Sequence, residues 1–166
     1  MKKFHLLLTI LLVAIFAVFA MGSGEDASVN QGTGSAATTA TEAQGSIGKY
    51  SVVIDSCRLA KDYEGKDIVI VKYIFTNVSD EESAAFFTTF DESVYQAGVG
   101  LNEALFLDES ANYSADNQTK EIKKGASLEV EVAYELNDTA TEIEVEVKEY
   151  FSFDDTTITK TFSIAG

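Results

Sequence analysis

Two segments near the C-terminal end, which alternate strictly between apolar residues and glutamates, constrain the fold most. They are SLEVEVAYEL at 127–136 and TEIEVEVKEYFSF at 141–153. An alternation of period two predicts strands with one dry and one solvated face, as antiparallel sheets have. The glutamates that share the solvated face are Glu129, Glu131 and Glu135 in the first segment and Glu142, Glu144 and Glu146 in the second.

These glutamates decide between two topologies. If the two segments were hairpin partners in one sheet, their glutamates would oppose each other across the ladder, where like charges destabilise. A crossover at NDTAT, 137–141, places them on opposite outer surfaces instead. We therefore predict an all-β, immunoglobulin-like Greek-key antiparallel β-sandwich, in which consecutive late strands belong to different sheets. The Cys and Trp hallmarks of antibody domains are absent.

Further strands are predicted on either side of this pair. YSVVI at 50–54 has Tyr50, Val52 and Ile54 on one face, and DSC at 55–57 then interrupts the alternation as a β-bulge would. The last strand, TITKTFSI at 157–164, directs Ile158, Phe162 and Ile164 inward. Lys160 is an exception on that inner face.

The strand within YEGKDIVIVKYIFTNVSD, 63–80, is apolar on both faces. Val69, Val71, Tyr73 and Phe75 share one face, and Ile68, Ile70 and Ile74 share the other. Two explanations stay open for the three isoleucines. Long Glu and Lys stems of neighbouring strands could shield them, or they could form an exposed apolar patch used for binding. The three are therefore the candidate binding residues.

The middle of the chain is the least regular. Thr89 and Glu92 have the spacing of a capping box and Gly98 can supply a left-handed stop, so we predict a short helix at 90–97. LNEALFL at 101–107 is predicted to be a strand. The aromatics of this region are expected to pack in the core or in a satellite cluster; they are Phe86, Phe87, Phe90, Tyr95 and Phe106.

The N-terminal residues predict export. Lys2 and Lys3 precede an unbroken apolar stretch that ends in small residues, so residues 1–20 are expected to be a cleaved signal peptide. Residues 21–47 are rich in Gly, Ser, Ala and Thr and predict a flexible, low-complexity tether. The β-sandwich domain is then expected at 48–166. The protein should be secreted or associated with the cell envelope.

Composition excludes several functions. The formal net charge of −15 argues against nucleic acid and anionic membranes as partners, because both need a basic patch. His5, the sole histidine, lies in the predicted signal peptide, which excludes His-dependent nucleophiles and zinc sites from the exported protein. Cys57, the sole cysteine, cannot form an internal disulfide and is expected to be a half-buried small hydrophobe. No catalytic residue or cofactor is predicted.

Two alternatives rest on the carboxylates. The clusters SDEES, LDES and FDDT could supply oxygen ligands to calcium, although none has the spacing of a complete calcium loop. A carboxylate pair could catalyse glycoside hydrolysis in a small hydrolase, but no pair can be singled out by spacing. A calcium-stabilised structural surface domain and a small hydrolase are thus the alternatives to a non-catalytic binding module.

The order of these segments also resembles a known group. YSVVIDSCRLAKDYEGKDIVIVKYIFTNVSDEE, then VYQAGVGL, KEIKKGASLEVEVAYEL and VEVKEYFSFDDTTITKTFSI resemble small exported lipoprotein domains of unknown function from Gram-positive bacteria. That group is related to immunoprotective extracellular antigens of immunoglobulin-like fold. The resemblance covers residues 49–164. It implies a β-sandwich, surface exposure and no catalytic motif.

One departure from the group concerns the anchor. Met21 stands where members carry a lipidated cysteine, so no diacylglyceryl anchor is expected, and the chain should be released or retained by an uncleaved apolar segment. The sequence thus predicts a secreted or cell-surface module that binds a protein or another surface ligand and is not an enzyme.

Overall fold

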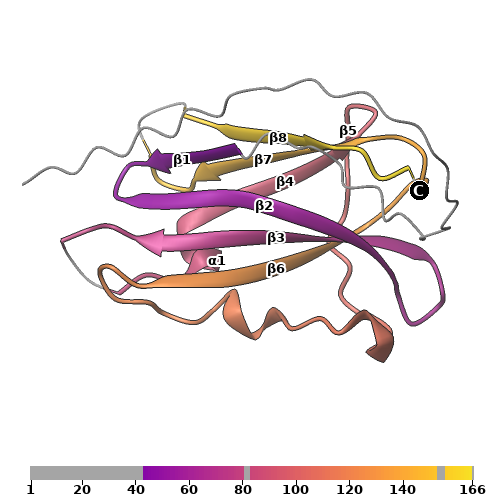
Figure 1. Cartoon of the computed structure of the whole chain (residues 1–166), viewed down its shortest axis with the longest axis horizontal. Helices are drawn as coiled ribbons and strands as arrows, with labels where there is room; N and C mark the ends of the chain where they lie inside the picture. The colour runs from indigo at the N-terminus through magenta and orange to yellow at the C-terminus, as the bar shows by residue number, and fades with distance from the viewer. Residues whose placement is uncertain (1–42, 81–82, 153–155, 166) are drawn as a thin grey trace, which may run out of the picture. The chain divides into compact units, whose positions relative to one another are not determined.

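Two four-stranded antiparallel sheets face each other in the computed structural model, which describes residues 43–80, 83–152 and 156–165 (Figure 1). The first sheet has the order β1 (Ala43–Ile47), β2 (Tyr50–Lys61), β3 (Asp67–Asn77) and β6 (Ser127–Glu135). The second has the order β5 (Val99–Gly100), β4 (Phe90–Gln96), β7 (Ile143–Glu149) and β8 (Ile158–Phe162). One short helix, α1 (Phe86–Thr89), and the 3-10 turns η1 (Glu109–Ala111) and η2 (Ala115–Asn117) complete the described elements. The predicted β-sandwich is confirmed.

The crossover inferred from the glutamate columns is also present. β6 belongs to the first sheet and β7 to the second, so the two columns do not oppose each other. The buried side chain of Gln96 holds the connection between them. Its Nε2 donates to the carbonyls of Asp138 and Thr141 at 2.9 and 3.0 Å, and its Oε1 accepts from the Asn137 amide at 2.9 Å. One amide side chain thereby fixes the loop that changes sheets.

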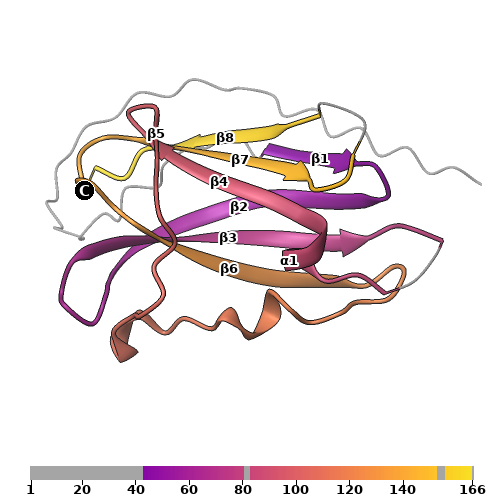
Figure 2. The same cartoon turned by 180° about the vertical axis from the view of Figure 1, so that it is seen from behind.

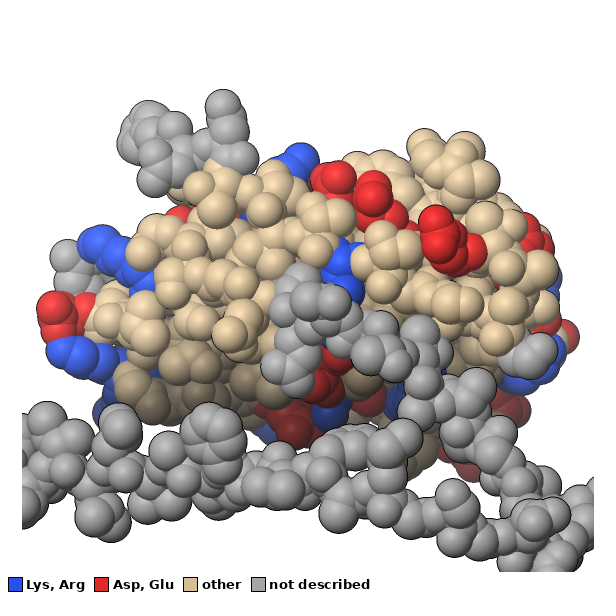
Figure 3. Space-filling view, turned by 45° about the horizontal axis from the view of Figure 1, so that its top comes forward, with Lys and Arg blue, Asp and Glu red and all other residues tan. Residues whose placement is uncertain are grey.

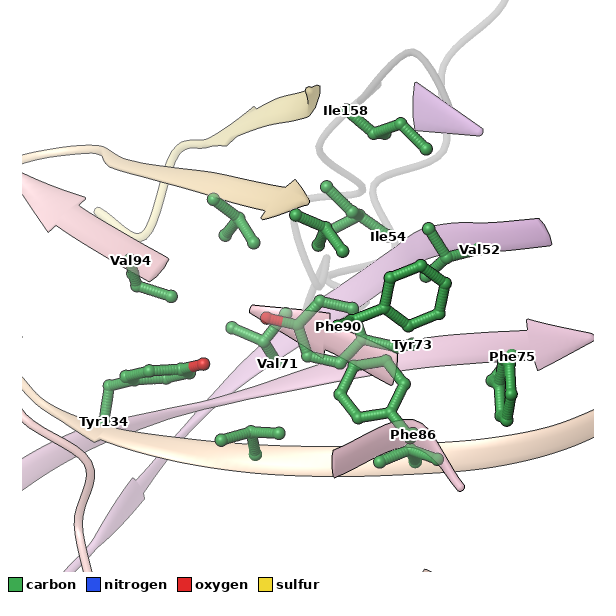
Figure 4. Packing of buried hydrophobic residues seen from close by; sticks show 14 of the residues in the cluster. Val52, Ile54, Val71, Tyr73, Phe75, Phe86, Phe90, Val94, Tyr134 and Ile158 are labelled. Atoms are coloured by element: carbon green, nitrogen blue, oxygen red, sulfur yellow. The ribbon is translucent and has the colours of Figure 1, made fainter. Parts of the chain in front are cut away.

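The main core fills the space between the sheets with residues from their inward faces (Figure 4). Phe86 of α1 packs between Tyr73 and Phe75 of β3 and Phe90 of β4, with ring centroids 5.1 to 6.2 Å apart. Tilted and edge-on rings at such spacing are favourable beyond the area they bury. The aromatic group therefore ties the two sheets together at the α1 end.

β3 is buried on both faces, because a second, smaller core lies on the outer side of the first sheet. Ile68 and Ile70 are 0% and 1% exposed there and pack with alanines contributed by β6 and by the chain between β5 and β6. Those alanines are Ala104, Ala111 and Ala133. The exposed-patch hypothesis is therefore wrong for these two isoleucines. The shield is a connecting segment of the chain together with Ala133 of β6, not the Glu and Lys stems that were one of the two explanations.

The predicted bulge in β2 is confirmed by a register shift between Ile54 and Ser56. Its carbonyls are bound by Lys160 of β8, which is 5% exposed and crosses from the opposite sheet. Lys160 Nζ donates to the Ile54 and Asp55 carbonyls at 2.8 and 2.7 Å. The ammonium also lies 4.9 Å from the ring centroid of Phe162. The polar exception on the inner face thus joins the two sheets.

The helix predicted at 90–97 is wrong, because these residues form β4 and the turn that follows it. Phe90, Val94 and Gln96 are buried at even spacing and β4 pairs with β7 along its length. Thr89 donates its hydroxyl to the Ala85 carbonyl and so does not cap a helix start. Ala97 and Gly98 both have positive φ, as a two-residue hairpin turn requires. Pairing with β7 outweighed the local capping signal.

Three other boundaries differ from prediction. The segment 101–107 is not a strand and makes only isolated bridges, through Glu103 and Leu107. β7 ends at Glu149, so Phe151 is 87% exposed in a turn. Residues 43–47, predicted to be tether, form β1, because Ile47 is buried in the main core.

The predicted signal peptide and residues 21–42 of the predicted tether lie outside the described residues. Within the described ranges, no helix is long and apolar enough to cross a membrane.

The outer edge of β6 is closed by backbone and by side-chain amides. Ala104 donates to the Ala133 carbonyl and Glu135 to the Asn102 carbonyl, at 2.8 and 2.9 Å. Farther along the edge, Gln118 Nε2 donates to the Glu131 carbonyl and Asn117 Nδ2 to the Glu129 carbonyl, at 2.7 and 2.9 Å. These amides donate hydrogen bonds to backbone carbonyls that could otherwise accept from another strand.

Substitution of Ile70 by alanine tests the second core. Because the side chain is 1% exposed, its truncation should lower the free energy of unfolding by roughly 2 to 5 kcal/mol. Val78→Ala, at a valine that is 50% exposed, should change it by less than about 0.5 kcal/mol. Denaturant melts measure both. An unchanged midpoint for Ile70→Ala beside a clear loss for Val71→Ala in the main core would contradict the second core.

Substitution of Lys160 by methionine keeps the length of the side chain and removes its donors. The carbonyls of Ile54 and Asp55 then lose the ammonium inside the sandwich, so stability should fall by about 1 to 3 kcal/mol. Lys148→Met, at an exposed lysine of β7, is the matched control and should be nearly neutral. Equal midpoints for the two variants would show that the ammonium does not stabilise the bulge.

Candidate functional site

The strongest candidate for a binding surface is an apolar patch where the β2–β3 turn meets the segment 103–108. Tyr63, Leu105 and Phe106 are 64%, 76% and 70% exposed there, and we call these three residues the end patch. The rings of Tyr63 and Phe106 meet edge to face, with centroids 5.9 Å apart and planes at 82°. Contiguous exposed apolar side chains of this kind mark interaction sites on soluble domains.

Backbone hydrogen bonds fix the end patch from both sides. The Tyr63 amide donates to the Phe106 carbonyl, and the Asp108 amide donates to the Lys61 carbonyl, each at 3.2 Å. Asp62 and Leu107 form a bridge between these contacts. The patch is therefore held in one arrangement before any partner arrives, which lowers the entropy cost of binding.

Asp62 organises the turn that carries Tyr63. Its carboxylate is 8% exposed and accepts hydrogen bonds from the amides of Glu64 and Lys66, both at 2.8 Å. Gly65 has a φ of +82°, a conformation that side chains disfavour. Asp62 thus acts as a structural acid, and Tyr63 projects outward as a result.

The end patch is hollowed and its flank is acidic. A hollow of about 560 Å³ is lined by Tyr63, Leu105, Phe106 and Leu107. A second hollow of about 280 Å³ adjoins it and includes Glu64, Glu103, Glu135 and Lys66 among its lining residues. Lys66 pairs with Glu64 at 2.6 Å, so the remaining carboxylates leave this flank negative.

The chain as a whole is also acidic, with a formal net charge of −15. Figure 3 shows one face of the molecule, on which acidic and basic side chains are scattered over a broader uncharged surface. The end patch is defined by the exposure of its three large apolar side chains. Its acidic flank would favour a basic partner.

A second candidate lies at the open side of the sandwich, between β6, the edge strand of the first sheet, and the part of β4 that the short strand β5 does not pair with. The segment 101–104 crosses this side, because the Leu101 amide donates to the Val94 carbonyl at 2.7 Å and the Ala104 amide to the Ala133 carbonyl at 2.8 Å (Figure 2). Beside it is a hollow of about 310 Å³, which we call the edge hollow. Its lining includes Glu92, Tyr95, Leu101, Glu103 and Tyr134.

Glu92 faces the interior of the sandwich, because it lies between Phe90 and Val94 on the inward face of β4. Burial, the main cause, and the negative charges of Glu103 and Asp91 together raise the pKa of this carboxyl from 4.5 to about 8. A hydrogen bond from its own backbone amide acts in the opposite direction. Glu92 is consequently protonated in most molecules at neutral pH.

Two tyrosine hydroxyls approach Glu92 from the opposite sheet. Tyr73 and Tyr134 are 0% and 2% exposed, and their hydroxyls point toward each other in Figure 4. Neither hydroxyl has a hydrogen-bond partner of normal length within the part of the chain that the structure describes. Burial raises the pKa of both. Next in size, the interaction between the two phenols lowers the pKa of Tyr73 and raises that of Tyr134, and the charge of Glu92 raises both.

The predicted binding residues are not brought together at a surface. Ile68 and Ile70 lie in the second core, whereas Ile74 is half-buried and pairs with Glu129 of β6. The end patch was missed, because Tyr63 lies in a predicted turn and Phe106 was expected to pack in a core. Phe87 was expected to be buried as well, yet it is 55% exposed. The one sequence feature that could have indicated the end patch was an aromatic residue, Tyr63, within a predicted turn.

Cys57 is half-buried beside the main core, as expected. Burial raises the pKa of its thiol to about 11, so the thiolate is scarce at neutral pH.

The acidic clusters are spread apart or lie partly outside the described residues. Asp108 accepts from the Ser110 amide at the start of η1, and Asp80 pairs with Lys124. Residues 81–82 and 153–155, which belong to the other clusters, are not described. No group of three or more His, Cys, Asp or Glu side chains suited to a metal ion occurs among residues 43–80, 83–152 and 156–165.

Comparison with known proteins gives a family and a fold. The family model for a domain of unknown function, DUF5067, matches residues 25–149. No protein with a curated description matches the chain. The solved structures that it resembles come from Gram-positive bacteria, and at identities below 25% they support the fold alone.

Three of these structures are informative. A protein assigned as a lipoprotein from Bacillus subtilis has a TM-score of 0.56 and 14% identity over 76% of this chain. This chain spans only 40% of the length of that protein. One with the same assignment from Staphylococcus aureus has a TM-score of 0.53 and 18% identity over 75% of this chain and 94% of its own. A protein from Enterococcus faecalis has a TM-score of 0.53 and 18% identity over 73% of this chain and 89% of its own.

Replacement of Glu92 by glutamine should change how stability depends on pH. A carboxyl whose pKa rises from 4.5 to about 8 on folding binds a proton more tightly when folded. Its contribution to stability is therefore complete below pH 4.5 and is lost as pH rises toward 8. Relative to the wild type, Glu92→Gln should gain more than about 1 kcal/mol between pH 5 and pH 8.5. Urea melts at the two pH values measure this gain.

Glu144→Gln, at an exposed glutamate of β7, is the control and should parallel the wild type across that pH range. Parallel pH profiles for Glu92→Gln and the wild type would show that Glu92 does not titrate in this window.

Proposed function

Because this chain belongs to the DUF5067 family of domains of unknown function, we propose that it is a non-catalytic binding module of the cell envelope. The end patch is the observation that carries this proposal. Three large apolar side chains remain 64% to 76% exposed although the backbone beneath them is hydrogen-bonded on both sides. Exposure of rigid apolar side chains costs solvation energy, which a partner that covers them would recover.

The partner that fits the end patch is a protein segment with an apolar side chain between basic residues. The hollow between Tyr63, Leu105 and Phe106 is large enough for one aromatic or aliphatic side chain. Glu103 and Glu135 on the flank would attract basic residues on either side of it. The net charge of −15 favours the same class of partner at longer range.

Two observations support the proposed location at the envelope. The apolar N-terminal segment with Lys2 and Lys3 before it has the features of an export signal. Two of the similar structures are assigned as lipoproteins, whose place is the cell envelope. Met21 stands at the position expected for a lipidated cysteine, so attachment would use another device or the protein would be released.

A labelled peptide in which Leu-Phe is flanked by two lysines on each side tests the end patch. Fluorescence polarisation should show that it binds the protein, and that Phe106→Ala weakens binding at least fivefold by removing the ring that covers it. Phe87→Ala removes a phenylalanine of similar exposure outside the patch and should leave the affinity unchanged.

The same peptide with glutamates in place of the lysines separates the charge effect from the apolar one and should bind at least tenfold more weakly at low salt. Equal losses from the two phenylalanine variants, or equal affinities for the two peptides, would reject this surface as the binding site.

A further inference from the structure

The edges of the two sheets are not equally protected. On one side of the sandwich, Asn117 and Gln118 close β6, while β5 and the amide of Leu101 cover part of β4. The other side carries β1 and β8 (Figure 1). Within the described ranges, the outer edges of these two strands make no backbone hydrogen bond. A free edge of this kind is a template for pairing with another strand.

The free edges also differ from the closed edge in charge. β6 carries Glu129, Glu131 and Glu135, whereas neither β1 nor β8 contains an acidic residue. In a chain with a net charge of −15, two copies can pair only where like charges do not oppose each other. Gly45 at the centre of β1 weakens that strand as a partner. β8 is therefore the edge best suited to a second copy of this chain.

We propose that β8 pairs antiparallel with β8 of a second copy, across a two-fold axis at Thr161. The alternation of side chains continues beyond the end of β8, because Ser163 is exposed and Ile164 is buried. Residues 158–164 therefore offer one continuous edge for the pairing. This edge contains no residue of the end patch, so the proposal does not rest on the proposed function.

The inward side chains of β8 place the axis. With Thr161 opposite its own copy, Lys160 faces Phe162 of the second copy, and Ile158 faces Ile164. An ammonium beside an aromatic ring is favourable, and within one copy Lys160 already lies 4.9 Å from the ring centroid of Phe162. An axis at Lys160 would instead set two ammonium groups opposite each other, which is destabilising.

The outward side chains of the paired strands are small and uncharged. Thr161 faces its copy and Thr159 faces Ser163, and such hydroxyl pairs stabilise a sheet. The nearest acidic column is on β7, where Glu144 lies beside Thr161 within one copy. Its counterpart in the second copy is three strand spacings away, about 14 Å. That distance exceeds the Debye length of ~8 Å at physiological ionic strength, so the repulsion is largely screened.

The pairing ends at two copies. A two-fold contact uses the same edge of both molecules, so no second β8 edge remains free. The outer edges of the joined sheet are those of β4 and β5, which Leu101 covers in part. The product is a closed dimer in which the second sheets of the two copies are continuous.

Disulfide trapping of the full chain tests this arrangement. Thr161→Cys places a thiol on the axis with the two Cα atoms about 5 Å apart, which a disulfide can span. Oxidised glutathione should therefore convert this variant to a covalent dimer. Thr159→Cys should react at least tenfold more slowly, because its copy lies four residues along the ladder, about 14 Å away.

Two controls measure the background of this reaction. Thr119→Cys, at an exposed threonine outside the sheets, reports random collision and should react as slowly as Thr159→Cys. The wild type, whose sole cysteine is the half-buried Cys57, should stay uncrosslinked.

Charge at the axis gives a second, independent measurement. Thr161→Glu and Thr161→Lys each oppose like charges and should weaken self-association at least tenfold in sedimentation velocity of the full chain. An equimolar mixture of the two should restore it, because a carboxylate then faces an ammonium. The same two substitutions at Thr119 should change nothing, alone or mixed. Thr161→Lys keeps the test valid if Thr161→Glu, beside Glu144, does not fold.

Equal crosslinking rates for Thr161→Cys and Thr119→Cys would overturn the proposal, and so would a mixture of the charged variants that stays monomeric. A wild type that is monomeric at millimolar concentration would show that the edge does not take a second copy. Salt should strengthen the dimer by screening the net charge, whereas it should weaken the lysine-flanked peptide at the end patch. The two surfaces can therefore fail separately.

Discussion

Burial of β3 on both faces is the constraint on which the rest of the molecule depends. One face completes the core between the sheets, and the other can be removed from water only if another part of the chain covers Ile68 and Ile70. The covering segment contributes Ala104 and Ala111, small residues that let its backbone approach the sheet closely. Because the segment is held down at these points, Leu105 and Phe106 between them are held outward. The exposure of the end patch is thus a by-product of the second core.

The sandwich could be predicted because its signals are local and repeated. The glutamates of β6 and β7 alternate with apolar residues over whole strands, so a single misplaced residue would not hide the pattern. β4 was mistaken for a helix because Thr89, Glu92 and Gly98 imitate cap signals, whereas the period of Phe90, Val94 and Gln96 indicates a strand. The pairing with β7, distant in sequence, decided between the two.

The candidate sites could not be predicted in the same way. The exposure of Phe106 follows from hydrogen bonds between its segment and the turn at 62–63, more than 40 residues earlier in the chain. Glu92 and Tyr134 line one hollow although they belong to different sheets. Neither of these long-range contacts can be recognised from the spacing of residues close together in the sequence. The three isoleucines were correctly recognised as unusual, but the pattern did not indicate that the chain would cover two of them itself.

The closed edge of β6 has a consequence for the proposed location at the cell envelope. Proteins confined to an envelope meet copies of themselves far more often than proteins diluted in solution do, and an open strand invites copies to join into one continuous sheet. Asn117 and Gln118 occupy the carbonyls of Glu129 and Glu131 with groups that cannot extend a ladder. Two amide side chains on η2 and beside it would thereby allow dense display of the domain without the growth of fibres.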